Sequence, residues 1–142
     1  MRGWGLILMA AALAGAVAGC GSSGRPHDSG ARATVTRYFA ALGGHRSDAA
    51  CAQLTPESQD KLAEFGGDAL HLRRPSCSAT LKRLFASPAG PRLRTLAHAP
   101  IVSVKMEGNA AVVAVRGVDG PVKVVRDGGA WRIESSPTGE SR

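Results

Sequence analysis

Aromatic residues are scarce in this chain of 142 residues, where three Phe, two Trp and one Tyr make up 4% of the total. Hydrophobic residues reach 44%, a share typical of a globular domain, but alanine supplies much of it. Any core must therefore be built mainly from light aliphatic side chains. Once an export segment is removed, about 120 residues would remain, enough for one domain with a core of its own.

Motifs of catalytic and metal chemistry are missing as well. The sequence has no Gly-x-Ser-x-Gly elbow, no phosphate-binding glycine loop and no calcium-binding loop. His45, His71 and His98 do not combine with the cysteines in the short paired spacings that bring four zinc ligands together. We therefore expect no catalytic residue, no metal and no cofactor.

No hydrophobic run is long enough to cross a membrane, because the longest spans residues 6–17 and a spanning helix needs about 20. Its length fits the apolar region of a secretory signal. Met1-Arg2 supplies the positive charge that precedes such a region. We predict a signal peptide over residues 1–19.

The sequence Val17-Ala18-Gly19-Cys20 resembles the bacterial lipobox, in which an aliphatic residue and two small residues precede an obligatory cysteine. The resemblance implies a diacylglyceryl thioether on Cys20, often followed by N-acylation. Two or more acyl chains hold a protein stably on a membrane, whereas one chain gives only marginal binding. We expect a lipid anchor in the cell membrane, facing the extracytoplasmic side. The alternative is an ordinary secretory signal with an incidental cysteine.

The segment that starts at Cys20, residues 20–30, is small, polar and interrupted by a proline. Such a composition cannot bury enough apolar surface to order itself, which predicts a flexible tether with a solvated His27. We expect the folded domain over residues 31–135 and a disordered tail over residues 136–142.

Cys51 and Cys77 remain as an even pair once Cys20 is assigned to the anchor. Export places them in an oxidising compartment, where such a pair is expected to form a disulfide. The alternative is two free buried thiols that pack as small hydrophobic side chains.

The charge is strongly basic, at +7 with a pI near 10.2. The cations are scattered in pairs such as Arg73-Arg74 and Lys82-Arg83, without a helical stripe interleaved with aromatics. We therefore expect no nucleic-acid partner, and a solvated basic surface beside an anionic membrane.

Residues 31–42 have the spacing of an amphipathic helix that ends at Gly43-Gly44. Its expected apolar face consists of Val35, Tyr38, Phe39 and Leu42. Further helices are expected to begin at Ser47, behind the N-cap Thr55 and behind the N-cap Ser76.

The helix after Thr55 is expected to end before Gly66-Gly67, and residues 86–100 to be irregular. From residue 101 the period becomes that of strands. Four short runs cover residues 101–107, 110–116, 121–126 and 130–135, with Gly, Asn and Asp between them. Val102, Val104 and Met106 are expected on one face of the first strand, and Trp131 and Ile133 on one face of the last. This order predicts an α+β domain with N-terminal helices packed on a curved antiparallel sheet of about four strands.

At this level the chain resembles the nuclear-transport-factor-2-like superfamily of α+β cones, in its small bacterial lipoprotein form. The resemblance is carried by residues 34–42 (TVTRYFAAL), residues 47–51 (SDAAC), the hairpin around Gly108-Asn109 and the ending at residues 127–133 (DGGAWRI). It covers most of residues 31–135 and implies the fold, while one fold hosts many functions.

The superfamily includes enzymes like ketosteroid isomerase and polyketide cyclase, which place an acidic base and a tyrosine or acid inside an apolar cone. Tyr38 lies where such a tyrosine could be placed. The candidate acids fall in turns, at strand ends or opposite the face of Trp131: Glu107, Asp119, Asp127 and Glu134. The resemblance therefore leaves Tyr38 and Trp131 as pocket candidates without a catalytic partner.

The sequence thus predicts a membrane-anchored exported lipoprotein whose domain is a non-catalytic binding or scaffold module of the cell envelope. Its expected partners are the membrane, through the lipid anchor, and a small apolar ligand or an envelope protein. Two alternatives are a small enzyme of the cyclase or isomerase type, and a structural envelope lipoprotein without a ligand.

Overall fold

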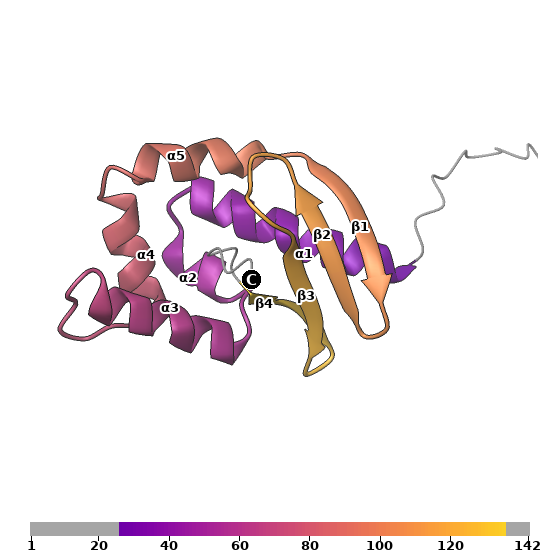
Figure 1. Ribbon diagram of the computed structural model, residues 1–142, viewed down its shortest axis with the longest axis horizontal. Helices are drawn as coiled ribbons and strands as arrows, with labels where there is room; N and C mark the ends of the chain where they lie inside the picture. Colours follow the sequence, from indigo (N-terminus) through magenta and orange to yellow (C-terminus); the bar gives the residue numbers. More distant parts are fainter. Residues whose placement is uncertain (1–25, 136–142) are drawn as a thin grey trace, which may run out of the picture.

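The structure is a computed structural model and describes residues 26–135. Helices come first and strands last, so the protein has the α+β organisation that the sequence predicts (Figure 1). The elements are α1 (Pro26–Gly43), α2 (Ser47–Cys51), α3 (Pro56–Asp68), α4 (Cys77–Phe85), α5 (Gly90–Thr95), the 3-10 helix η1 (Leu96–His98), β1 (Ile101–Glu107), β2 (Ala110–Val115), β3 (Val122–Asp127) and β4 (Ala130–Ser135). The predicted signal peptide, Cys20 and the tail over residues 136–142 lie outside the described residues.

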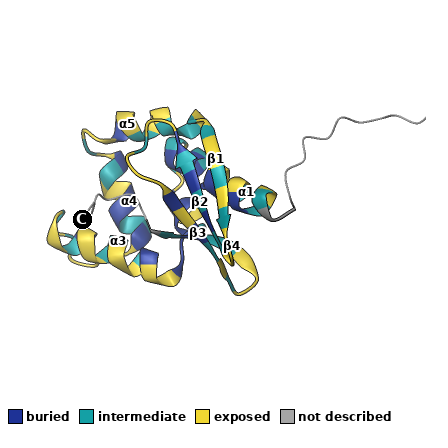
Figure 2. Ribbon diagram, turned by 45° about the vertical axis from the view of Figure 1, so that its right-hand side comes forward, coloured by how far each residue is buried: buried dark blue, intermediate teal, exposed yellow. Residues whose placement is uncertain are grey.

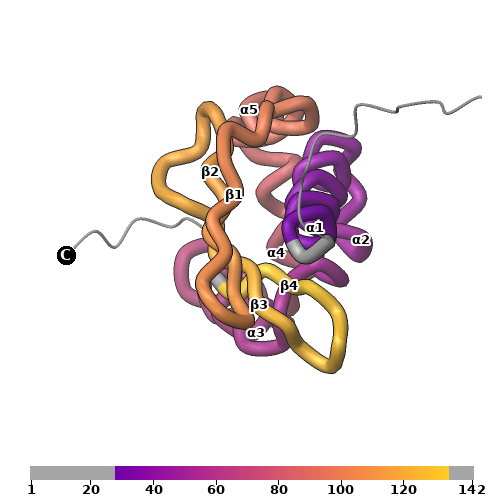
Figure 3. The backbone as a smooth tube through the Cα atoms, turned by 90° about the vertical axis from the view of Figure 1, so that its right-hand side faces the viewer, coloured from indigo at the N-terminus to yellow at the C-terminus, as the bar shows by residue number. Residues whose placement is uncertain are grey.

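The four strands form one antiparallel sheet in the order β1-β2-β3-β4, the meander that the short intervening turns predict. Helix α1 crosses one face of the sheet and contacts all four strands. Seen close to its axis, α1 lies in front of one side of the curved sheet (Figure 3). The turns need left-handed backbone, which glycine supplies at Gly108 (φ 62°) and at Gly129 (φ 82°).

The core lies between α1 and this sheet, and burial alternates along the strands as their period requires (Figure 2). All four residues of the predicted apolar face of α1 are buried: Val35, Tyr38, Phe39 and Leu42. The sheet supplies mainly β-branched residues, namely Val113, Val115, Val122, Val124 and Ile133. The core is therefore light and aliphatic, as the shortage of aromatics indicates.

Both predicted side-chain caps are present. The Thr55 hydroxyl accepts a hydrogen bond from the Ser58 backbone N–H at 3.2 Å, with Pro56 in the first turn of α3. The Ser76 hydroxyl accepts one from the Ala79 backbone N–H at 3.1 Å at the start of α4. These local signals fix the start of two helices, as the sequence predicts.

Helix α1 begins at Pro26, five residues earlier than predicted, so the expectation of a flexible tether is wrong for residues 26–30. Proline fits the first turn of a helix, and Asp28 adds a favourable charge there. Gly30, the last residue of the expected tether, lies within this helix. Its missing side chain makes room for Trp131, since a Cβ there would lie 2.4 Å from the Cδ1 atom of that indole.

Helix α3 continues through Gly66-Gly67 to Asp68, so these glycines do not end it as predicted. Gly66 is buried, and a Cβ there would lie 2.0 Å from the Thr80 Oγ1 atom on α4. Gly66 thus lets α3 and α4 approach closely. The glycine is needed for this packing between helices, and the sequence near Gly66 alone does not reveal it.

Residues 86–100 are also more regular than predicted, because α5 and η1 lie within them. Pro91 occupies the first turn of α5, where a proline costs no hydrogen bond. Gly90 is buried, and a Cβ at this position would lie 2.1 Å from the backbone oxygen of Phe85. The segment therefore folds back tightly against the end of α4.

Strand β1 contains an irregularity that overturns one predicted side-chain direction. The register shifts between Ile101 and Ser103, as in a β-bulge, and Val102 is 61% exposed. Val104 and Met106 face the core as predicted, because they pair with the buried Val113 and Ala111. Period-2 counting fails at Val102 because one extra residue inverts the alternation.

A backbone connection joins β4 to the segment between α2 and α3. The Ile133 N–H donates to the Gln53 carbonyl oxygen at 2.8 Å, and the Thr55 N–H donates to the Ile133 carbonyl oxygen at 2.9 Å. Leu54 and Ile133 form a parallel bridge, and both side chains are essentially fully buried. The sheet and the helical half therefore share one core.

The close approach of α3 and α4 yields a stability prediction. Gly66→Ala should lower the free energy of unfolding by about 1–3 kcal/mol, because the β-branched, buried Thr80 has no free space to move into. The measurement is the urea midpoint of the purified protein.

Gly67→Ala is the matched control in the same helix. Its Cβ would meet only the Pro75 ring, at 3.4 Å, and alanine favours helix by about 0.5–1 kcal/mol. The control should be neutral or slightly stabilised. Equal losses in the two variants would contradict the packing described here.

Candidate functional site

The disulfide predicted from the cysteine count is present in the structure. Cys51 at the end of α2 bonds to Cys77 at the start of α4, with Cα atoms 6.0 Å apart and both residues buried. A hydroxyl chain reinforces this junction, since the Ser47 and Ser78 hydroxyls lie 2.9 Å apart and Ser78 donates to the Asp48 carboxylate at 2.6 Å. The bond thus ties α2 to α4, as the sequence predicts.

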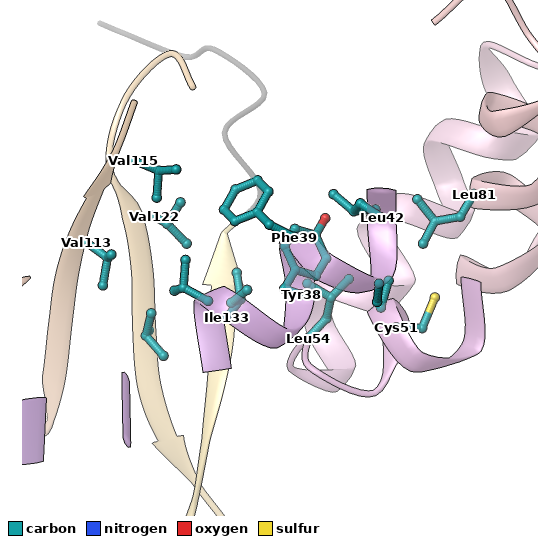
Figure 4. Close-up of a cluster of buried hydrophobic side chains, with 14 of the residues drawn as sticks. Tyr38, Phe39, Leu42, Cys51, Leu54, Leu81, Val113, Val115, Val122 and Ile133 are labelled. Carbon is teal, nitrogen blue, oxygen red and sulfur yellow. The ribbon is translucent and has the colours of Figure 1, made fainter. Parts of the chain in front are cut away.

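Tyr38, one of the two pocket candidates, lies within the core. Its side chain is only 5% exposed and meets the ring of Phe39 edge to face, with ring centroids 5.4 Å apart. Figure 4 shows both rings among the aliphatic side chains of the strands and of Leu42 and Leu54. Tyr38 therefore contributes to packing at the centre of the domain.

Trp131, the other candidate, lies on β4 against the first turns of α1. Its indole packs on Gly30, and the Arg126 guanidinium lies 4.7 Å from the ring centroid. The Trp131 carbonyl oxygen accepts a hydrogen bond from the Thr34 hydroxyl at 3.3 Å. The indole is half-buried, so its contacts are those of a side chain that closes one end of the core.

The structure does not bring the two candidates together at one site. The Trp131 indole contacts α1 at Gly30, whereas Tyr38 is eight residues further along the same helix. At 1.5 Å per residue, these positions are about 12 Å apart along the helix axis.

Among the described residues, every polar residue that is buried as a whole carries a hydroxyl group. The set consists of Thr34, Ser47, Thr55, Ser58 and Thr80. Ser58, for example, donates to the Glu134 backbone oxygen and receives a hydrogen bond from Thr55. Four of these hydroxyls cap or join elements through hydrogen bonds, whereas Thr80 Oγ1 has no hydrogen-bond partner. The Asp28 Oδ1 atom, in the first turn of α1, is also buried without one.

The acids considered as partners of Tyr38 are engaged at the surface of the sheet. Glu107 pairs with Lys105 at 3.1 Å, and Asp127 pairs with Arg132 at 3.4 Å. Glu134 pairs with Lys123, and Asp119 is exposed in the turn before β3.

The three histidines of the domain belong to three different segments. His45 and His71 have left-handed backbone, with φ of 54° and 53°, and His98 ends η1. Within residues 26–135, no three His, Cys, Asp or Glu side chains are grouped closely enough to hold a metal ion.

A contact between α4, α5 and the loop after α1 has no counterpart in the sequence-based prediction. The His45 ring stacks on Phe85, with centroids 4.6 Å apart and planes 2° from parallel. The Arg94 Nε–H donates to His45 Nε2 at 3.2 Å. These residues come from three distant segments, so only the fold places them together.

No protein-family model, curated protein or solved structure matches this chain. In the part of the chain that the structure describes, no helix is both long and apolar enough to cross a bilayer.

The disulfide generates a second prediction. Cys51→Ala/Cys77→Ala should lower the free energy of unfolding by about 3 kcal/mol, because 26 residues separate the cysteines and the bond restricts the unfolded chain. Urea denaturation should show this loss. Reductant should destabilise the wild-type protein to the level of the variant and leave the variant unchanged. Alkylation of both thiols in the unfolded wild-type protein without reductant would disprove the bond.

Proposed function

We propose that this chain is an exported lipoprotein, anchored to the cell membrane through Cys20 and facing the extracytoplasmic side. Two sequence features support the proposal: the apolar run over residues 6–17, and the small residues Ala18-Gly19 directly before the cysteine. The run matches a cleaved export signal in length, and the small residues match the site that lipid transfer and cleavage require.

The Cys51–Cys77 disulfide is the observation that carries the proposal furthest. Such bonds form and persist in oxidising compartments outside the cytoplasm. With these two thiols bonded to each other, Cys20 is the one cysteine of the sequence left for another use. Its place after Ala18-Gly19 is the place that a lipid-bearing cysteine occupies.

We propose further that the domain is a non-catalytic binding or scaffold module of the nuclear-transport-factor-2-like cone type. The four-stranded antiparallel sheet that curves beside α1 supports the cone. The ion pairs of Glu107, Asp127 and Glu134 at the surface support a role without acid–base chemistry.

The packing also supports the outer surface as the binding surface. Tyr38 and Phe39, which would line the interior of a cone, are 5% and 4% exposed and pack on each other. An envelope partner bound at the surface needs no rearrangement of this core.

The anchor is tested by Cys20→Ser, which should move the protein from the membrane fraction to the soluble fraction because the thioether has no sulfur to form on. In the wild-type protein, mass spectrometry should find a diacylglyceryl group on the tryptic peptide of residues 20–32. This peptide keeps the Arg25-Pro26 bond, which trypsin does not cut.

The matched control is Cys20→Ser/Ser23→Cys, which keeps the cysteine count but moves the thiol three residues away from Ala18-Gly19. It should remain unlipidated and soluble. A wild-type peptide without the lipid mass, or membrane partitioning unchanged in Cys20→Ser, would reject the proposed anchor.

A further inference from the structure

The charges of this protein are segregated along the chain. Helix α3 carries four acidic residues and one lysine, and Lys61 donates a hydrogen bond to Glu57 that lowers the pKa of this carboxyl group. From residue 69 to residue 106 there are seven Arg or Lys and no Asp or Glu. The acidic helix α3 is therefore followed by a purely basic stretch that contains α4 and α5.

The fold gathers part of this basic charge in one place. Phe85 ends α4, and the stacked His45 and its hydrogen-bonded Arg94 bring α5 and the loop after α1 to this ring. Lys82 is one helical turn before Phe85, and Arg46 directly follows His45. We call Arg46, Lys82 and Arg94 the basic cluster.

The basic cluster is exposed, and the nearby Asp48 carboxylate accepts a hydrogen bond from the Ser78 hydroxyl without forming an ion pair with any cation of the cluster. All three side chains are exposed, and within the described residues none of them is in an ion pair. By contrast, Lys61, Lys105 and Lys123 each pair with a glutamate. The negative ends of α4 and α5 favour Lys82 and Arg94 locally, but they do not account for Arg46, which lies in neither helix.

The position of the basic cluster relative to Cys20 bears on which kind of partner can reach it. Cys20 is six residues before Pro26, where α1 starts, and Arg46 lies just beyond the other end of this helix. At 1.5 Å per residue, the 18 residues of α1 separate the two ends by about 27 Å. On the proposed anchor, the basic cluster therefore lies near the end of α1 opposite to the one that leads toward Cys20; the two ends of the helix can be followed in Figure 1.

We propose that the basic cluster is a docking surface for a linear, phosphate-bearing polymer of the cell envelope. Guanidinium groups bind phosphate oxygens in a bidentate fashion, and two of the three cations are arginines. A polymer can follow α4 and α5 while the acidic α3, which packs beside α4, repels it. The orientation part of this inference rests on the proposed anchor, whereas the binding part does not.

The test uses the purified full chain with Cys20→Ser and long-chain polyphosphate as the probe. Arg46→Gln/Lys82→Gln/Arg94→Gln should weaken binding about tenfold at low salt. It should also reduce the slope of log Kd against log salt by about 2, because three phosphate contacts are lost. The control Lys61→Gln/Lys105→Gln/Lys123→Gln removes the same charge from ion-paired positions and should change Kd by less than about threefold.

Circular dichroism of both triple variants confirms that they fold. If both variants lose the same affinity for polyphosphate, the effect is one of net charge and the proposal is wrong. The proposal is also wrong if the wild-type protein does not bind polyphosphate. A second arm uses vesicles of phosphatidylglycerol. If the basic cluster governs vesicle binding as strongly as polyphosphate binding, the partner is a lipid surface and the proposal is wrong. None of these readouts depends on lipidation, so the anchor stands or falls separately by the Cys20 experiments.

Discussion

The contact between the apolar face of α1 and the concave sheet is the interaction on which the other elements depend. Because the core has few aromatic rings, it is filled by Val, Ile, Leu and Ala side chains that each contribute little area. Burying them requires both α1 and all four strands in place. The disulfide and the backbone bonds of Ile133 extend this unit to α2, α3 and α4. The helical half is thus attached to the sheet at several points and does not form a separate domain.

Local chemistry explains which parts of the fold could be predicted from the sequence. Caps at Thr55 and Ser76, the amphipathic spacing of α1 and the turn residues between strands act within a few residues, and the structure follows them. Two of the errors share one cause, which is that distant contacts changed the meaning of a local signal, whereas the early start of α1 and the helix α5 follow local proline signals that were not used. Gly66 continues a helix because Thr80 lies against it, and the bulge at Val102 inverts an alternation that counting takes as fixed.

The residues of the candidate site also fall into those that the sequence could predict and those that it could not. The Cys51–Cys77 bond followed from parity and compartment, without knowledge of the fold. Tyr38 and Trp131 were proposed together by resemblance, but the structure separates them along α1 and gives each a packing role. The basic cluster was out of reach of sequence reasoning because Arg46, Lys82 and Arg94 belong to three segments. The stack of His45 on Phe85 and the hydrogen bond from Arg94 to His45 bring these segments together, and neither contact is visible in the sequence.

The irregularity in β1 has a consequence for how copies of this protein coexist. β1 and β4 are the two edge strands of the sheet, and β4 is bonded at Ile133 to the segment between α2 and α3. At β1, unpaired backbone groups form a template for pairing with another chain. The bulge at Val102 interrupts this template near the start of β1. Later in the same strand, the exposed Lys105 places a positive charge on the edge. A sheet with such an edge resists edge-to-edge aggregation. Copies of this domain that come close together therefore lack a regular edge to pair along at β1, and each one can remain a separate folded unit.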